Sequence, residues 1–252
     1  MTVFGIRVLG DKMSNYVILS PTAHHNTKVI TERGADYGDQ VKYAVTYPLE
    51  FRNIQSSYPI FFSKSEDTGE FFAVALLGFE NNENLFLNDS GWDAPYIPMM
   101  VERQPFLIGF QVSKEAEEGK KPVVSIDMES SRISEDQGEA LFNDDKEPSE
   151  FLKSMMVKLE ALHQGYEHSK GFIAAMTAND LLEPFTLEIT LDDGSTNQLL
   201  GFYTINEPKL AELDGDTLAE LNSNGYLQPI FMAVASHARV RALIEKKNAL
   251  LR

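Results

Sequence analysis

The spacing of hydrophobic residues along this chain changes near its middle. Before residue 127 the apolar residues gather in short runs separated by turn-forming residues, a pattern that predicts β-strands. The predicted strands are 16–19, 59–63, 71–79, 106–112 and 123–126. Because the run from Phe71 to Phe79 contains no polar side chain, we expect a central strand there, with both faces buried.

After residue 147 the apolar residues recur at intervals of three and four, which is the spacing of one face of a helix. The pattern predicts a long amphipathic helix over about 148–180, in which Gly165 and Gly171 could produce a bend or a break. The apolar face of this helix would carry Leu152, Met155, Leu159, Leu162, Tyr166, Ile173 and Met176.

A β-hairpin is predicted directly after the long helix. Phe185, Leu187 and Ile189 alternate with polar residues, and the pair Asp193-Gly194 can form a tight turn, so we expect two antiparallel strands over 185–205. These strands should join a sheet that is formed by the first half of the chain.

Four shorter segments predict helices. Over 48–57 the apolar residues Leu49, Phe51 and Ile54 should face inward, and 95–104 should form a helical turn. Near the C-terminus we expect a helix over 217–224, with a capping box from Thr217 and Glu220, and a last helix over 229–248.

These elements together predict an α+β fold. The sheet should be mostly antiparallel, with the long helix (about 148–180) and the C-terminal helix packed on it. We expect a single domain over 13–252, because the hairpin follows the long helix at once. Met13 opens an ordinary start, so 1–12 could be an N-terminal extension.

Composition adds mainly exclusions. The chain has 252 residues, 43% of them hydrophobic and none of them cysteine, which excludes disulfides, thiolate nucleophiles and cysteine metal sites. The net charge is −16. A surface that is this acidic argues against a nucleic-acid partner, because nucleic acids require basic groups to neutralise their phosphates.

The excess of acidic residues is largest over 127–150, which contains nine carboxylates and only two basic residues, Arg132 and Lys146. We interpret this segment as a solvated loop, and a basic partner is the alternative. The N-terminus lacks the long apolar stretch of a signal peptide, and the longest apolar run spans nine residues where a membrane-spanning helix needs about 20. We therefore expect a cytoplasmic protein with no membrane insertion.

The five histidines give no support for a metal site. His163 and His168 are five positions apart on the predicted helix, which turns them through about 140° and away from each other. His24 and His25 are adjacent, so in a strand they would point to opposite faces. No phosphate-binding loop or nucleophile elbow occurs. We therefore expect no metal and no cofactor, and the catalytic residues, if any, stay unknown.

Aromatic, acidic and basic residues are unusually dense between residues 84 and 106. Aromatic rings beside carboxylates and a guanidinium are typical of a binding pocket or of the centre of an interface. A structural core whose prolines fix its turns is the alternative. The candidate binding residues are Asp89, Trp92, Asp93, Tyr96, Arg103 and Phe106.

Several strings of this sequence resemble the bacterial SapC family. The most specific of them is FAVALLGFENNENLFLNDSGWDAPYIPMMVERQPF over 72–106, and LSPTAHH over 19–25 resembles the family's start. Others are YPIFF (58–62), ISEDQGEALFNDDKEPSEFL (133–152), LLEPFTLEITLDDG (181–194), LLGFYTINEPKLAEL (199–213) and NGYLQPIFMAVASHARVRAL (224–243). The resemblance covers nearly all of the chain from about Met13.

The resemblance implies a context for the protein. The family is named for a surface-layer protein locus whose neighbours encode a secretion system. Similar proteins also occur beside outer-membrane TonB-dependent receptors and enzymes that resemble flavin-dependent tryptophan halogenases or cupin-type oxygenases. One hypothesis is therefore a non-enzymatic, cytoplasmic accessory protein of a surface-layer, secretion or peptide-modification system. It would bind a protein partner through the region from Trp92 to Phe106, with the acidic 127–150 segment as a second candidate surface.

The other hypothesis is an enzyme or small-molecule binder that acts on a peptide or an amino-acid derivative. In that case Trp92 and Tyr96 would stack on the ligand and Arg103 would bind a carboxylate. Asp89 or Asp93 would supply a polar group or a metal ligand.

Overall fold

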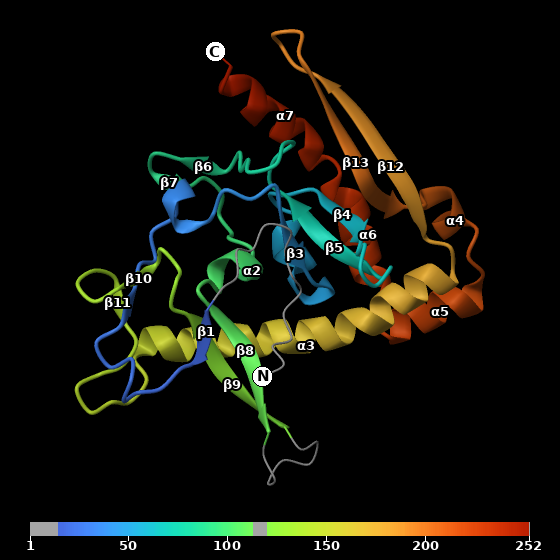
Figure 1. Cartoon of the computed structure of the whole chain (residues 1–252). Coiled ribbons are helices and arrows are strands. Elements are labelled where there is room, and N and C mark those ends of the chain that lie inside the picture. The colour runs from blue at the N-terminus through green and yellow to red at the C-terminus, as the bar shows by residue number, and fades with distance from the viewer. Residues whose placement is uncertain (1–14, 113–119, 252) are drawn as a thin grey trace. The chain divides into compact units, whose positions relative to one another are not determined.

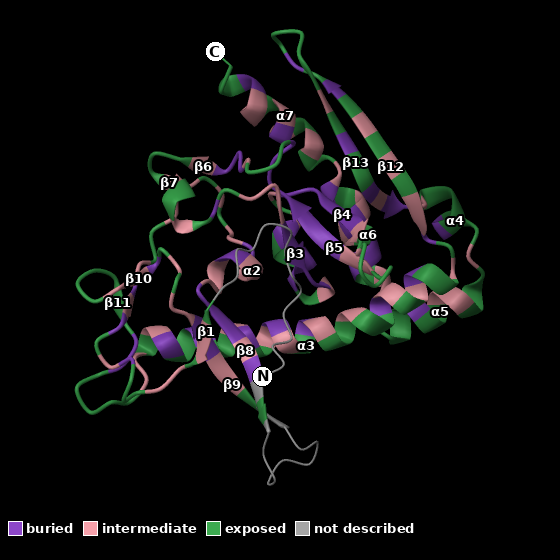
Figure 2. Cartoon of the chain, in the orientation of Figure 1, coloured by how far each residue is buried: buried purple, intermediate pink, exposed green. Residues whose placement is uncertain are grey.

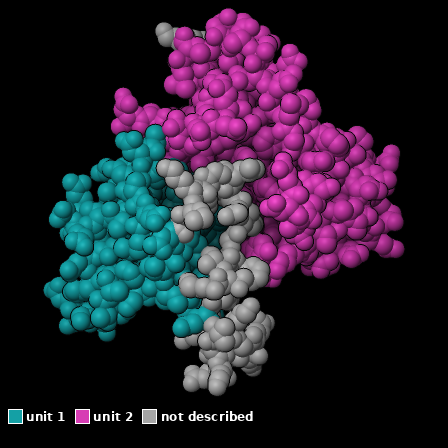
Figure 3. Space-filling model, viewed as in Figure 1, with its two compact units in different colours: residues 1–38, 99–164 teal, residues 39–98, 165–252 magenta. Residues whose placement is uncertain are grey.

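The computed structural model describes residues 15–112 and 120–251. The chain is divided into two compact units, each built from two separate stretches (Figure 3). The first unit comprises 1–38 and 99–164, and the second comprises 39–98 and 165–252. The proposed extension over 1–12 lies outside the described residues, and the single domain over 13–252 stays a prediction.

The first unit contains two small antiparallel sheets (Figure 1). One sheet has the strand order β1-β9-β8, with β1 at Tyr16–Ile18, β9 at Lys120–Asp127 and β8 at Phe106–Val112. In the other, β2 (Lys28–Val29) lies between β10 (Ile133–Ser134) and β11 (Glu139–Ala140). The unit also contains η1 (Ala35–Tyr37) and α2 (Met99–Glu102). The strands predicted near 16–19, 106–112 and 123–126 are therefore confirmed.

The core of the first unit forms between its sheets and the first half of helix α3, which runs from Glu150 to Ala178. The helix contributes Leu152, Met155 and Leu159, at the predicted spacing of three and four residues. The other buried members of this core are Val29, Phe106, Ile126, Leu141 and Phe142. Burial of apolar side chains from both sequence segments is what holds this unit together.

The acidic segment over 127–150 is more ordered than the expected solvated loop. Its carboxylates at 135–139 and 144–147 are exposed as expected, but β10 and β11 lie within it and pair with β2. Arg132 in this segment is fully buried and donates from Nη1 to the carbonyls of Ile30 (2.9 Å) and Glu32 (2.8 Å). Its guanidinium also lies 5.5 Å from the centre of the Tyr37 ring. Arg132 therefore connects the acidic segment to the backbone at Ile30 and Glu32.

The second unit is built on a five-stranded antiparallel sheet with the order β12-β13-β4-β5-β3. The strands are β3 (Tyr43–Thr46), β4 (Ile60–Lys64), β5 (Phe71–Leu76), β12 (Leu182–Thr190) and β13 (Thr196–Ile205). The predicted hairpin is β12 and β13, and it joins the sheet where Phe202 and Tyr203 pair with β4. Strand β5 is flanked by strands on both sides and is mostly buried (Figure 2), as its continuous apolar run predicts.

Helices of the second unit pack around this sheet, and the expected α+β class is confirmed. They are η2 (Pro48–Glu50), α1 (Phe51–Ile54), the second half of α3, α4 (Glu207–Ala211), α5 (Gly215–Ser223), α6 (Leu227–Ser236) and α7 (Arg239–Ala249). Phe172 of α3 is fully buried between Phe51 and Phe62, with ring centroids 6.1 and 6.4 Å away. A two-strand hairpin, β6 (Leu87–Asn88) with β7 (Gly91–Trp92), completes the unit.

The two glycines of the long helix allow close packing, and they do not split it. Helix α3 is continuous over its 29 residues. A Cβ atom at Gly165 would lie 3.2 Å from Tyr47 and 2.3 Å from the side chain of Leu49. One at Gly171 would lie 2.2 Å from the hydroxyl of Tyr226. The absence of a side chain at both positions lets neighbouring segments approach the helix.

Two local predictions were wrong. Leu49 does not face inward with Phe51, since 46% of its surface is exposed. The first turn of the predicted 48–57 helix is a 3-10 turn, which changes the direction of its side chains. Helix α5 is capped by Asp214, whose carboxylate accepts from the Thr217 backbone N–H at 2.8 Å. Thr217 is therefore inside the helix and is not its cap.

The predicted C-terminal helix over 229–248 is two helices, because the chain turns at His237. Its Nε2 lies 3.2 Å from both the carbonyl of Ile60 and the hydroxyl of Thr204. The ring also stacks on Phe61, with centroids 5.1 Å apart. The neighbouring Ser236 hydroxyl accepts from the Ile60 N–H at 2.8 Å. These contacts with the sheet end α6 where sequence periodicity alone would continue it.

Stability is expected to fall with acid because of His237. Burial lowers the pKa of this imidazole from its ordinary value of 6.5, although the Ile60 carbonyl and Glu207 act in the opposite direction. Below about pH 6.5 the unfolded chain therefore binds the proton more readily than the folded one, so this contribution to stability is lost as the pH falls. Urea unfolding at pH 8, 6.5 and 5 should show a smaller acid loss for His237→Gln than for the wild type. Equal acid losses would contradict this role.

Candidate functional site

The turn that presents Trp92 is the β6–β7 hairpin of the second unit. The Asn88 side chain accepts from the Ser90 N–H (2.9 Å) and hydroxyl (2.6 Å), and Gly91 has a φ of 106°. Only glycine adopts such a conformation without strain, so the Asn-Asp-Ser-Gly sequence specifies this turn. Asp89 lies at its exposed tip. The interpretation of this stretch as a β-turn that presents Trp92 is confirmed.

A chain of hydrogen bonds connects the aromatic residues of the candidate cluster. The Trp92 Nε1–H donates to the Tyr58 hydroxyl at 2.7 Å, and that hydroxyl donates to the backbone carbonyl of Tyr96. The Tyr96 hydroxyl donates to Glu50 Oε1 at 2.8 Å, and the Thr46 hydroxyl donates to Glu50 Oε2 at 2.8 Å. The polar atoms of both predicted aromatic residues are therefore directed to other parts of the protein.

Burial fixes the middle of this network. Tyr58 and Glu50 are almost completely buried, whereas Trp92 and Tyr96 are half-buried. Burial raises the pKa of the Tyr58 hydroxyl far above its ordinary value of 10, the charge of Glu50 raises it further, and the bond from Trp92 opposes this shift. Tyr58 therefore stays neutral and keeps its proton for the Tyr96 carbonyl. The result is a rigid aromatic group that is held from inside the unit.

Asp93 is connected to the C-terminal helix and not to Arg103. Its Oδ2 lies 2.5 Å from Lys246 Nζ of α7, with 60% of the Asp93 side chain exposed. The same ammonium lies 4.9 Å from the centre of the Phe86 ring, which packs edge-on against Tyr58 at 4.6 Å. This ion pair extends the Trp92 network to α7. An exposed pair of this kind contributes little stability, about 0–1 kcal/mol.

Arg103 and Phe106 belong to the first unit. Arg103 Nη1 donates to the Phe106 carbonyl at 2.6 Å, across the turn that leads into β8. Phe106 is fully buried in the core of its unit, against Phe151 among others. Phe106 therefore has no surface to offer a ligand, and its role is structural. The side chain of Arg103 is half-buried, and one of its N–H donors stabilises this turn.

The histidines occupy separate environments. The Nδ1 of His24 accepts from the Ser20 N–H at 3.0 Å, and His168 is exposed beside the ring of Tyr226. Within 15–112 and 120–251, no three His, Asp or Glu side chains are grouped so that they could hold a metal ion.

Sequence reasoning missed the internal partners of the cluster. Tyr58, Glu50 and Lys246 are 34 to 153 positions away from the cluster residues to which they bond. Only Tyr58 carried a signal, because it opens the aromatic string at 58–62. A buried glutamate inside a predicted amphipathic helix is not distinguishable from an exposed one by sequence.

Comparison with protein families identifies the chain as a whole. The family model for SapC matches residues 19–243, which is most of the sequence. The chain belongs to the SapC family. No curated protein and no solved structure matches it. In the part of this SapC protein that the structure describes, no helix combines the length and the apolar character needed to cross a membrane.

Proposed function

We propose that this SapC protein is a cytoplasmic accessory protein that binds a polypeptide partner, in association with a surface-layer, secretion or peptide-modification system. The observation that carries the proposal is the hydrogen-bonded network behind Trp92. A half-buried aromatic ring that is held rigid from inside loses little conformational entropy when a partner covers its exposed part. Rigid aromatic residues of this kind are typical centres of protein interfaces.

The same network supports binding over catalysis. The groups that an enzyme would need already have internal partners, because Tyr96 donates to Glu50 and Asp93 pairs with Lys246. A catalytic acid or base has to reach a substrate proton directly or through one water molecule. Engagement of these groups inside the protein therefore favours a contact surface over the enzyme or small-molecule binder.

The charge around Trp92 indicates the chemistry of the partner. Asp93 is already paired with Lys246, so the free acidic charge beside Trp92 is that of Asp89 at the exposed tip of the hairpin, in a chain whose net charge is −16. Such a surface repels phosphates and attracts basic side chains. We therefore propose a basic polypeptide segment as the partner, and no nucleic acid.

Replacement of Trp92 by alanine is expected to lower partner binding at least tenfold. The test is affinity purification with the wild type and Trp92→Ala, followed by mass spectrometry of the retained proteins. Phe71→Ala is the matched control, because Phe71 is a half-buried aromatic residue of β5 outside the cluster. The retained partner should also shift the fluorescence of the wild type directly, because Trp92 is the only tryptophan.

The melting temperature of each variant shows whether the variant has kept its fold. If Trp92→Ala is folded and retains every partner that the wild type retains, the proposed surface is wrong. If Phe71→Ala loses the same partner, the loss is not specific to Trp92. A partner that depends on Trp92 but not on Phe71 supports the proposal.

A further inference from the structure

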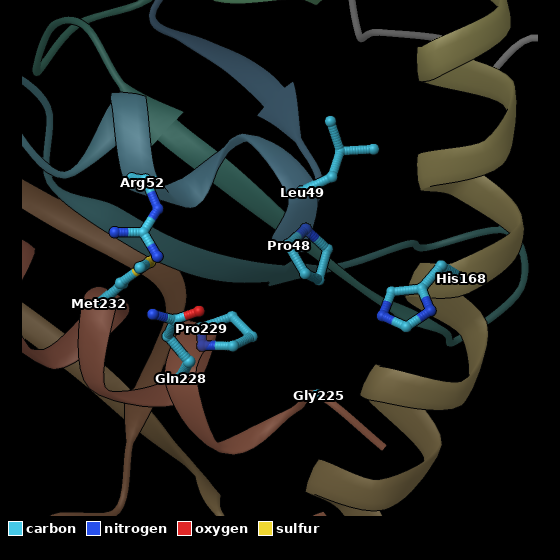
Figure 4. A pocket seen from close by; sticks show the side chains of 8 residues that line it. All are labelled: Pro48, Leu49, Arg52, His168, Gly225, Gln228, Pro229 and Met232. Atoms are coloured by element: carbon cyan, nitrogen blue, oxygen red, sulfur yellow. The ribbon is translucent and has the colours of Figure 1, made fainter. Parts of the chain in front are cut away.

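A depression of about 240 Å³ lies on the second unit and has no part in the Trp92 network. Figure 4 shows the eight side chains or backbone positions around it. They come from η2, α1, the second half of α3, the turn between α5 and α6, and α6. The lining residues are Pro48, Leu49, Arg52, His168, Gly225, Gln228, Pro229 and Met232.

Polar side chains on two sides of this depression are unused within the protein. Figure 4 shows the Arg52 guanidinium and the Gln228 amide on one side and the His168 ring on the other. Among the described residues, the side chains of Arg52 and Gln228 have no hydrogen-bond or ion-pair partner. Both groups are therefore available to donate to a ligand.

The apolar part of the depression is exposed to water. Leu49 is 46% exposed, and Pro48 and Met232 are half-buried. These three apolar side chains line the depression together with the polar donors. Covering such a surface is favourable by about 25 cal/mol per Å² of apolar area.

The lining is positively charged in a strongly acidic protein. Arg52 is charged, and none of the eight lining residues carries a carboxylate. Of the nearest acidic residues in the sequence, Glu50 is buried and bonded to Thr46 and Tyr96, and Glu167 pairs with Lys170. The depression therefore favours an anionic group next to an apolar one.

We propose that this depression binds the carboxyl-terminal residue of a polypeptide whose last side chain is apolar. Its volume is below the 300–1,000 Å³ of sites for larger ligands, so it suits about one residue. A terminal residue supplies a carboxylate and an apolar side chain together, whereas an internal acidic residue supplies its carboxylate alone. Arg52 can bind the carboxylate through two N–H groups, with Gln228 as a further donor, while Leu49 and Met232 contact the side chain.

Removal of the charge of either partner should weaken this binding at least tenfold. The probe is a fluorescein-labelled hexapeptide, Gly-Ser-Gly-Ser-Gly-Leu, with a free carboxylate, and binding is measured by anisotropy. Arg52→Met and an amidated form of the probe should each lose at least tenfold in affinity. Leu49→Asp should abolish binding, because it places a like charge beside the carboxylate. The matched control is Arg241→Met, an exposed arginine of α7 that pairs with Glu245.

Several results of the same measurements would overturn the proposal. Equal affinity of the amidated probe, equal affinity of Arg52→Met, or no saturation up to about 2 mM would overturn the proposal. Equal binding of an amidated probe with an internal aspartate before the leucine would also overturn it, in favour of an internal acidic segment. Trp92→Ala should leave probe binding unchanged, so this proposal and that for the Trp92 surface can fail separately.

Discussion

Arg132→Met is expected to lower the free energy of unfolding by about 3 kcal/mol or more. The side chain is completely buried, and it donates from one nitrogen to the carbonyls of Ile30 and Glu32. Methionine fills much of the volume but cannot donate. A hydrogen bond from a charged donor such as this guanidinium contributes about 1.5–3 kcal/mol, two of them are lost, and the contact of the guanidinium with the Tyr37 ring is lost as well. Chemical denaturation of both proteins measures the difference directly.

Hydrogen exchange would show where the loss occurs. The amides near residues 30–37 should exchange faster in Arg132→Met, because the arginine holds that segment. Lys28→Met is the matched control: Lys28 is a half-buried cation of the same unit that also donates to a carbonyl, that of Asp136 at 3.1 Å. It should change stability by about 0.5 kcal/mol or less. A loss below about 1 kcal/mol for Arg132→Met would show that the two carbonyls find other partners.

The local pattern of hydrophobic residues was sufficient to predict a strand or helix wherever neighbours in the sequence are also neighbours in space. Strands β12 and β13 were predicted because alternation and the Asp193-Gly194 turn are both local signals. The first half of α3 was predicted because Leu152, Met155 and Leu159 lie on one helical face. In these cases the residues that bury one another are separated by a few positions, so periodicity contains the information.

The pattern failed where distant contacts determine the backbone. Nothing near His237 indicates a break, because the turn there depends on Ile60 and Thr204. In the same way β10 and β11 depend on pairing with β2, about a hundred positions earlier. A pair of two-residue strands has almost no periodicity of its own, and tertiary pairing decides it.

The candidate site was predicted by composition and not by arrangement. The density of aromatic and charged residues at 84–106 grouped Trp92, which lies in the second unit, with Phe106, which is a core residue of the first unit. Trp92 and Tyr96 do share one network. The residues that join them, Tyr58 and Glu50, lie outside the predicted stretch. Adjacency in the sequence therefore identified Trp92 and Tyr96, but it did not identify Tyr58 and Glu50, which hold them in place.

Glu50→Ala should be about as damaging as the loss of Arg132, with a cost of about 3–5 kcal/mol. The carboxylate is 1% exposed and accepts from the hydroxyls of Thr46 and Tyr96. The substitution leaves two donors without a partner at about 1–3 kcal/mol each, and it creates a cavity. Glu50→Gln keeps the shape and one acceptor, so it should cost less. Urea denaturation gives these values, with exposed Glu66→Ala as a control that should change little.

The emission of the single tryptophan connects this prediction to the proposed function. If Glu50 holds Tyr96, and Tyr96 and Trp92 share Tyr58, then Glu50→Ala should loosen Trp92 and shift its emission toward longer wavelengths in the folded state. Partner binding should weaken with it, because a mobile ring must be ordered again when the complex forms. A stable Glu50→Ala protein with wild-type emission would show that Trp92 does not need the network. The rigid surface from which partner binding is inferred would then lack its physical basis.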